Sequence, residues 1–173
     1  EPSFQVLVEP YLQFATQTSM TVMWHTSLQA SSVVRYGPTD ACNQTIEGNA
    51  SAIHEVVLEG LEPETQYFYR VESRTPAGTS YLSEPATFKT AVKKETPYAF
   101  AVISDTQGNP KVSKQIAELA WGQRPSFLLH PGDLVSTGKN REHWLKHFFP
   151  GMRPLINHVP FYPVLGNHEQ NAK

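Results

Sequence analysis

Residues 98–109 read YAFAVISDTQGN and decide the fold of the second half of the chain. Residues 98–103 form a nearly continuous apolar run, and the polar residues that follow include Asp105 and Gln107. An uninterrupted apolar run is typical of a strand that is covered on both faces, as in a parallel sheet. We therefore expect a buried strand here that delivers polar side chains to its carboxyl end.

The residues beyond this run alternate between the patterns of helices and strands. Residues 111–123 and 141–149 carry apolar side chains at helical spacing, and residues 126–130 and 159–165 are short apolar runs. This βαβαβ order predicts a partial α/β unit with a parallel sheet and right-handed crossovers. The helix positions expected to face the core are Val112, Ile116, Leu119, Ala120, Trp144, Leu145 and Phe148.

The first half of the chain has the period of β-strands. In residues 19–26, Met20, Val22 and Trp24 occupy alternate positions and so share one face of the expected strand. Short strands separated by turn residues predict an all-β sandwich, with His25 and His54 at its surface. The other strands are expected at residues 32–36, 55–58, 67–72 and 86–90.

A short polar segment, residues 91–96, separates the two patterns and is followed by Pro97. We therefore expect a β-sandwich domain at residues 1–92 and a partial α/β domain at residues 97–173.

The sandwich resembles a fibronectin type III domain. Residues 61–67, LEPETQY, open a late strand and follow a Trp in an early strand. In that family the Tyr bonds back to the main chain, which implies this role for Tyr67 and a core position for Trp24. The small sandwich at the front of purple acid phosphatases is of this kind.

Each expected strand of the α/β domain ends in a polar cluster. Asp105 and Gln107 follow the first strand, Asp133 follows the second, and Asn167 and His168 follow the third. Taken singly, each cluster is explained by a turn, because Gly supplies a positive φ and Asp or Asn bonds its own backbone. Three in succession indicate one site, because the carboxyl ends of parallel strands lie together. Such side chains bind two divalent cations, which clamp a phosphoryl group and generate hydroxide at neutral pH.

The Gly-Asp pair and the Gly-Asn-His-Glu string resemble the opening of the calcineurin-like metallophosphoesterase family, over residues 98–169. The resemblance implies hydrolysis of phosphate esters at a dinuclear metal centre, by an enzyme of the acid phosphatase or phosphodiesterase type. It assigns the roles as follows: Asp105 binds the first metal, Asp133 bridges both, Asn167 binds the second, His168 contacts phosphate and protonates the leaving oxygen, and Glu169 orients the loop.

Two positions depart from the family pattern. Gln107 stands where the family has His; it is either a ligand or a support for one, and an amide oxygen would shift the preference towards Mn²⁺, Mg²⁺ or Ca²⁺. Ser136 stands where purple acid phosphatases have Tyr, so their coloured iron–tyrosinate site is not expected. The identity of the two divalent metal ions stays open among Mn, Fe, Zn, Mg and Ca.

The family takes further His ligands from strands beyond the Gly-Asn-His-Glu string, whereas this sequence ends at Lys173. We therefore expect an incomplete portion of the catalytic domain that is inactive alone. The alternative is a non-catalytic, fibronectin-like binding or adhesion module with a degenerate phosphoesterase domain. A nucleotide-binding domain is not favoured, because residues 108–110, GNP, are not a Gly-rich phosphate loop.

The other histidines of the second half are less suited to metal binding. His143 and His147 have the i, i+4 spacing of a metal pair but lack the Glu of the zincin pattern, so they predict a solvated helix face. His130 and His158 stand next to expected strands and are predicted to serve packing or loop structure.

The distribution of charge along the sequence bears on which binding partners are expected. Residues 1–92 carry 4 Lys/Arg and 10 Asp/Glu, a net −6, whereas residues 93–173 carry 10 and 6, a net +4. The basic half favours an anionic ligand or is merely a set of scattered lysines. Neither nucleic-acid binding nor a membrane span is expected, because there is no basic–aromatic cluster and no long apolar run.

The compartment is less constrained by the sequence. Cys42 is the single cysteine, so it forms no intrachain disulfide, and the first residues lack the features of a signal peptide. The family resemblance implies a secreted protein, extracellular or periplasmic, whose leader is not present in this chain. The triplets that begin at Asn43 and Asn49 fit N-glycosylation of surface loops.

Overall fold

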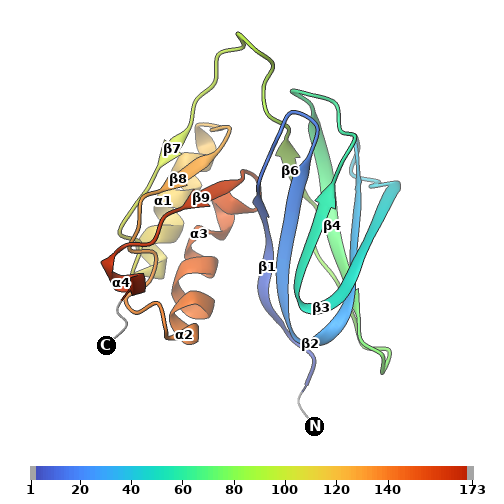
Figure 1. Ribbon diagram of the computed structural model, residues 1–173, viewed down its shortest axis with the longest axis horizontal. Helices are drawn as coiled ribbons and strands as arrows, with labels where there is room; N and C mark the ends of the chain where they lie inside the picture. The colour runs from blue at the N-terminus through green and yellow to red at the C-terminus, as the bar shows by residue number, and fades with distance from the viewer. Residues whose placement is uncertain (1–2, 171–173) are drawn as a thin grey trace. The chain divides into compact units, whose positions relative to one another are not determined.

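The structure is a computed structural model that describes residues 3–170. The chain divides into two compact units between Thr96 and Pro97. The first unit is a β-sandwich and the second is a smaller α/β unit with a parallel sheet (Figure 1). The fold class predicted from the sequence is confirmed.

Six antiparallel strands form the sandwich, and β2 is its central element. β2 pairs with β1, β3 and β4, and β4 pairs in turn with β5 and β6. The sequence did not predict β1, in which Pro10 and consecutive buried residues interrupt the alternation, or the very short β5. The strands are β1 (Val6–Gln13), β2 (Met20–Gly37), β3 (Gln44–Leu58), β4 (Gln66–Arg74), β5 (Ser80–Leu82) and β6 (Ala86–Lys89).

The two strands expected at residues 19–26 and 32–36 are one continuous strand, β2. Its first half pairs with β1 and its second half with β4, while β3 follows it throughout. The register with β3 shifts between His25 and Ser32. Such a bulge bends a strand, and it lies between the part of β2 that pairs with β1 and the part that pairs with β4.

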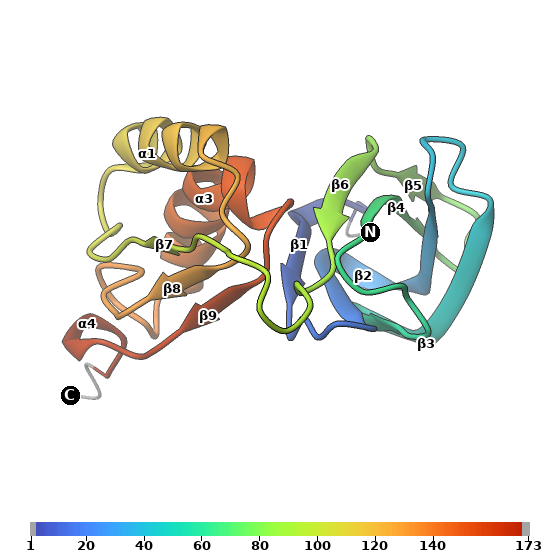
Figure 2. The same cartoon turned by 90° about the horizontal axis from the view of Figure 1, so that it is seen from above.

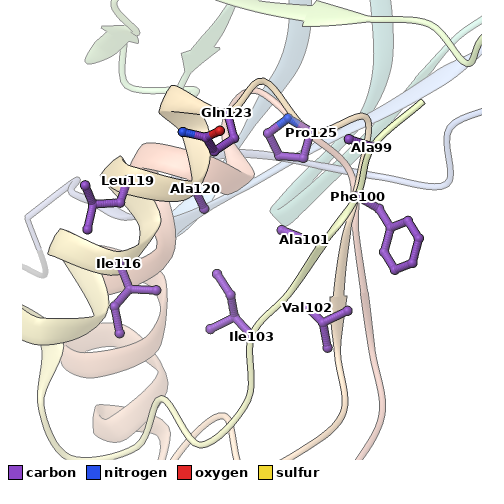
Figure 3. A pocket seen from close by; sticks show the side chains of 10 residues that line it. All are labelled: Ala99, Phe100, Ala101, Val102, Ile103, Ile116, Leu119, Ala120, Gln123 and Pro125. Carbon is purple, nitrogen blue, oxygen red and sulfur yellow. The ribbon is translucent and has the colours of Figure 1, made fainter. Parts of the chain in front are cut away.

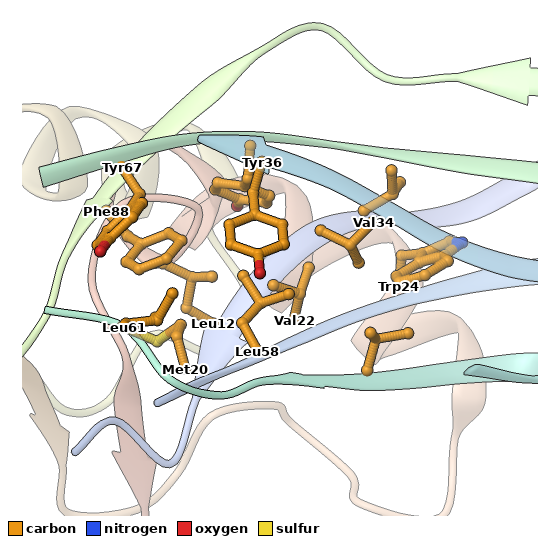
Figure 4. Packing of buried hydrophobic residues seen from close by; sticks show 13 residues of the cluster. Leu12, Met20, Val22, Trp24, Val34, Tyr36, Leu58, Leu61, Tyr67 and Phe88 are labelled. Carbon is orange, nitrogen blue, oxygen red and sulfur yellow. The ribbon is translucent and has the colours of Figure 1, made fainter. Parts of the chain in front are cut away.

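The sandwich core confirms the predicted inward face of β2. Met20, Val22 and Trp24 have no exposed surface and meet the aromatic side chains of the other strands (Figure 4). The indole Nε1 of Trp24 donates to Ser73 Oγ at 2.9 Å, which satisfies the one polar group that this burial would otherwise leave unpaired. Tyr67 makes the predicted corner bond, because its hydroxyl accepts from the backbone N–H of Glu62 at 2.9 Å.

His54 is buried in this core, so the prediction of a surface position was wrong. Its ring stacks on Trp24 with centroids 4.5 Å apart, and its two nitrogens lie 2.8 Å from Thr26 Oγ1 and 2.7 Å from Ser32 Oγ. The reason is register: His54 pairs directly with Trp24, and paired residues share a face of the sheet. Burial, and secondarily His25, lowers the pKa of His54 from 6.5 to about 4.

The second unit confirms the predicted βαβαβ order. The parallel sheet has the order β7 (Ala101–Val102), β8 (Leu128–His130), β9 (Phe161–Pro163). Helix α1 (Pro110–Gly122) joins β7 to β8; α2 (Arg141–His143), the π-helical turn η1 (Trp144–Phe148) and α3 (Phe149–Ile156) join β8 to β9; α4 (Asn167–Gln170) follows. None of the helices in residues 3–170 combines the length and apolar character needed to cross a membrane.

The helical stretch expected to end at residue 149 continues to Ile156. Pro150 does not stop it, because it stands in the first turn of α3, where backbone N–H groups have no partner within the same helix. Helix α1 begins one residue before the expected start at residue 111: Asn109 Oδ1 accepts from Val112 N at 3.3 Å, and Pro110 opens the first turn.

One face of the parallel sheet is uncovered by the described residues, contrary to the prediction for residues 98–103. Helices α1 and α3 lie on the same side of the sheet (Figure 2). Phe100, directly before β7, is 50% exposed, and Val102 in β7 is 59% exposed. The apolar run at residues 98–103 predicted a strand covered on both faces, but among the described residues only one face is covered, by the helices.

Helix α1 likewise leaves its predicted core face open. Its buried residues are Ser113 and Ala117, and it packs on α3 where Gly151 allows a close approach, since a Cβ there would lie 3.0 Å from Ser113 Cβ. Ile116 is 42% exposed and Leu119 is 73% exposed. The helix was predicted correctly, but the face that it buries among the described residues is the small-residue face and not the apolar one.

Neutral His54 makes the stability of the protein sensitive to acid. The unfolded chain, with a His pKa near 6.5, binds a proton more readily than the fold does between pH 6.5 and 4. The contribution is complete above pH 6.5 and is lost towards pH 4, amounting to about 3 kcal/mol of unfolding free energy. We expect this acid dependence in urea titrations to diminish in His54→Gln and to persist in the control His25→Gln. An NMR titration in which His54 protonates near pH 6.5 would contradict this account.

Candidate metal centre

Three loops meet at the carboxyl ends of β7, β8 and β9. The loop after β7 lies beside the loop after β8, because the N–H of Asp105 donates to the carbonyl of Gly132 at 3.3 Å. The loop after β8 is bonded to the segment after β9, because Asp133 Oδ1 accepts from the N–H of His168 at 3.0 Å. The parallel sheet thus brings together three segments that are far apart in the sequence.

The carboxylate of Glu169 fastens two of these loops to each other. Its Oε2 accepts from the N–H of Asp133 at 2.9 Å and from that of Gly166 at 2.8 Å, and its Oε1 accepts from that of Val135 at 3.0 Å. Hydrogen bonds from backbone N–H groups to a carboxylate are charge-assisted, and such bonds are among the strongest in proteins. Glu169 therefore orients the loops, as expected from the sequence.

Two glycines allow this close approach. A Cβ on Gly132 would lie 2.9 Å from the backbone of Gly166, and a Cβ on Gly166 would overlap Asp133. Gly132 also has a φ of +120°, which other residues rarely adopt. The Gly-Asp and Gly-Asn pairs are thus explained by contact between loops, beyond the needs of either turn alone.

Asp105 and Asp133 share an unusual backbone conformation. Their φ angles are 56° and 54°, in the left-handed region that costs free energy for a residue with a Cβ. Such conformations persist where surrounding bonds impose them, and they cluster at functional sites. The Asp105 carboxylate accepts from Ser104 Oγ at 2.6 Å, and Asp133 is held by the bonds of the Glu169 loop.

His168 is oriented by its own hydrogen bond. Its Nδ1 lies 2.9 Å from the carbonyl oxygen of Ser136, which accepts only from a protonated nitrogen. That bond leaves Nε2 as the nitrogen that exchanges a proton. Asn167, beside it, is the first residue of α4 and has an exposed side chain.

A buried polar chain lies beneath the first loop. Thr106 Oγ1 donates to the carbonyl of Leu134 at 3.1 Å and lies 3.1 Å from Nε2 of His130, which then donates to it. His130 has no exposed surface, and burial lowers its pKa, an effect that Glu169 and the two Asp partly oppose. The packing role predicted for His130 is confirmed. Thr106 was not among the predicted site residues, because a single hydroxyl side chain forms no recognisable sequence pattern.

Gln107 lies two residues after Asp105, on the loop that follows β7. Its carboxamide oxygen is shielded from solvent and has no hydrogen-bond partner among the described residues. Within residues 3–170 no group of three or more His, Cys, Asp and Glu side chains is placed to hold a metal ion. The predicted set is of another kind, since it combines two carboxylates with the amides of Asn167 and Gln107. Oxygen donors of this kind suit hard divalent cations such as Mg²⁺, Mn²⁺ and Ca²⁺.

The remaining histidines of this unit make ring contacts. His158 stacks on Trp121 with centroids 4.2 Å apart, as its predicted packing role requires. His143 and His147 stack on each other with centroids 5.2 Å apart and are half-buried, so the predicted solvated face is only partly right.

Comparison with known proteins gives a match for each unit. Residues 8–90 match the family described as purple acid phosphatase, N-terminal domain, and residues 98–173 match the family described as calcineurin-like phosphoesterase. Purple acid phosphatase 23 of Arabidopsis thaliana is 30% identical over 144 residues, which are 68% of this chain and 30% of that protein. An acid phosphatase of Aspergillus ficuum is 30% identical over 105 residues, 57% of this chain and 16% of that protein.

Two solved structures share the fold of the chain. A purple acid phosphatase from yellow lupin (Lupinus luteus) seeds has a TM-score of 0.76 at 18% identity, over 92% of this chain and 35% of that one. The structure of PhoD has a TM-score of 0.71 at 13% identity, over 97% of this chain and 40% of that one. The chain therefore spans between 16% and 40% of the length of these relatives.

Removing the Glu169 carboxylate should release the two loops that it joins. We expect Glu169→Ala to lower the unfolding free energy of the full-length protein by at least about 2 kcal/mol, because three donors lose a charged acceptor. The control is Glu142→Ala, whose carboxylate is exposed and pairs with Lys146. Amide exchange followed by NMR should speed up at Asp133, Val135 and Gly166. Unchanged exchange at these three amides would show that other contacts hold the loops.

Proposed function

Since this chain joins the N-terminal domain of purple acid phosphatases to a segment of a calcineurin-like phosphoesterase domain, we propose that the intact protein hydrolyses phosphate esters at a dinuclear metal centre. The observation that carries the proposal is the convergence of the three loops, held by the Glu169 carboxylate and the Asp105–Gly132 bond. Asp105 and Asp133 stand at this sheet edge with left-handed backbone conformations, which cluster at functional sites, and their carboxylates are suited to binding cations.

The oxygen-rich side chains would hold the two cations. In this proposal Asp105 binds the first, Asp133 bridges both and Asn167 binds the second. A carboxylate suits the bridging position because it has two oxygens and a negative charge. When bound, a pair of divalent cations about 3.5–4 Å apart neutralises phosphoryl oxygens and supplies a nucleophile at neutral pH.

His168 would contact the phosphate and act as general acid towards the leaving oxygen. The bond from Nδ1 to the Ser136 carbonyl fixes the ring and keeps the exchangeable proton on Nε2. Its N–H bond to Asp133 Oδ1 fixes the backbone position of His168 relative to the bridging carboxylate. A general acid needs this kind of positioning before its pKa matters.

The metals of this centre would differ from those of a purple enzyme. Position 136 is Ser, and its carbonyl is occupied by His168, so no phenolate is offered there. The proposed metal ligands Asp105, Asp133 and Asn167 all offer oxygen atoms, which supports Mn²⁺, Mg²⁺ or Ca²⁺ over Cu²⁺ as the bound cations.

We propose further that the rest of the intact protein completes the α/β domain. The apolar face of α1 and the strand at residues 99–103 line an open cavity of about 470 Å³. Ile116 and Leu119 of α1 stand on one side, the strand's Ile103 points toward them, and Phe100 and Val102 point away from the helix (Figure 3). Exposed apolar surface of this extent marks a contact with further chain or a partner. The 173 residues alone would then lack both this contact and the remaining metal ligands, and would be inactive.

A second candidate is a non-catalytic binding module. It is favoured by one observation: the sandwich has a closed core of its own, whereas the α/β unit departs from its family at Gln107. In that case the fibronectin-like unit would carry the function and the metal-binding loops would be vestigial.

The location that we propose is extracellular or periplasmic. The side chains of Asn43 and Asn49 are exposed, as N-glycosylation in a secretory pathway would require.

Catalysis should depend on divalent metal and on the converging loops. We expect the full-length protein to release p-nitrophenol from its phosphate mono- or diester with Mn²⁺ and to lose this activity with a chelator. Asp133→Asn should reduce turnover to background, and His168→Asn should reduce it by roughly 10²-fold or more. Asp40→Asn, on the exposed surface of the sandwich, is the control. Absence of turnover with every divalent metal would favour the binding module.

The open face of α1 should be covered in the intact protein. Leu119 is 73% exposed here, so Leu119→Ala would be neutral if nothing further packed on it. We expect the substitution to lower the unfolding free energy of the full-length protein by at least about 2 kcal/mol. The control, Ile53→Ala, removes a side chain that is 60% exposed on the sandwich and should be neutral. Equal and negligible effects would mean that this face stays open.

A further inference from the structure

The carboxamide oxygen of Gln107 lacks the donor that its burial requires. It is shielded from solvent and has no hydrogen-bond partner among the described residues. Burying an amide oxygen without a partner is unfavourable, so such atoms are rare in native proteins. An acceptor kept in this state indicates a missing electropositive group, either a water or a cation.

The surroundings favour a cation. Gln107 lies two residues after Asp105, which has a left-handed backbone conformation and carries its carboxylate on the same loop. Thr106, between them, is bonded on both sides: its hydroxyl donates to Leu134 and its carbonyl accepts from Ser113 Oγ at 3.1 Å. The loop is therefore fixed from beneath, and Gly108, with a φ of +80°, turns the chain away directly after Gln107. The loop thus carries a carboxylate and a buried amide oxygen, two hard oxygen donors, on a backbone that Thr106 anchors.

We infer that Gln107 Oε1 is a ligand of the first cation and sets its preference for Mn²⁺, Mg²⁺ or Ca²⁺ over Zn²⁺. This inference rests on the proposed function. The amide oxygen is a neutral, hard donor, whereas imidazole nitrogen at the same place suits Zn²⁺, Cu²⁺ and Fe²⁺. A single residue would thus set which metal the phosphoesterase uses.

The test is metal binding by the metal-free, full-length protein, measured by calorimetry and by the electron paramagnetic resonance of bound Mn²⁺. We expect Gln107→Ala to weaken Mn²⁺ binding at one site by at least about tenfold, which is about 1.4 kcal/mol. Gln107→Glu, which keeps an oxygen and adds charge, should bind Mn²⁺ at least as tightly as the wild type. Gln107→His should raise the ratio of Zn²⁺ to Mn²⁺ affinity by about tenfold or more. Gln115→Ala, an exposed amide on α1, is the matched control.

The outcomes separate this inference from the proposed function. If the wild type binds no divalent cation, both are overturned. If it binds two cations and Gln107→Ala leaves their affinities and the Zn²⁺ to Mn²⁺ ratio unchanged, the proposed function stands and a water, not a cation, satisfies Gln107. If circular dichroism shows that Gln107→Ala folds poorly, Gln107→Glu and Gln107→His decide the matter, because both retain a polar side chain. An unchanged metal preference in Gln107→His together with weakened Mn²⁺ binding in Gln107→Glu would overturn the inference.

Discussion

The three hydrogen bonds to the Glu169 carboxylate are the contacts on which the candidate site depends. They tie the backbone after β8 to the backbone before α4, and in doing so they set the separation between Asp133 and the Asn167–His168 pair. The approach is possible only because Gly132 and Gly166 carry no Cβ. A parallel sheet brings strand ends to one edge, but it does not by itself fix side chains to within the tolerance that metal binding needs.

Much of this arrangement could be predicted from the sequence, because the relevant signals are local. The alternation of Met20, Val22 and Trp24 predicts the buried face of β2, and the apolar runs predict the strands of the parallel sheet. The polar clusters stand directly after those runs, so their meeting at one edge follows from topology. The roles of the individual metal-binding residues stay predictions.

The features that the sequence did not predict depend on contacts between distant residues. His54 is buried because β3 pairs it with Trp24, on the same face as Val56 and Leu58. The expected strand began at residue 55 and so left His54 outside it. The apolar stripe of α1 predicted a core contact, whereas Ser113 and Ala117 make the contact with α3. Thr106 is likewise a support defined only by its partners Leu134 and His130.

The central claim is that Asp105, Asp133 and Asn167 converge on a shared pair of cations. Anomalous diffraction from crystals of the full-length protein grown with Mn²⁺ tests it most directly. The account predicts two anomalous peaks about 3.5–4 Å apart, with Asp133 between them and Asp105 and Asn167 each on one of them. Peaks at other places, or a single peak that Asp133 does not touch, would contradict it.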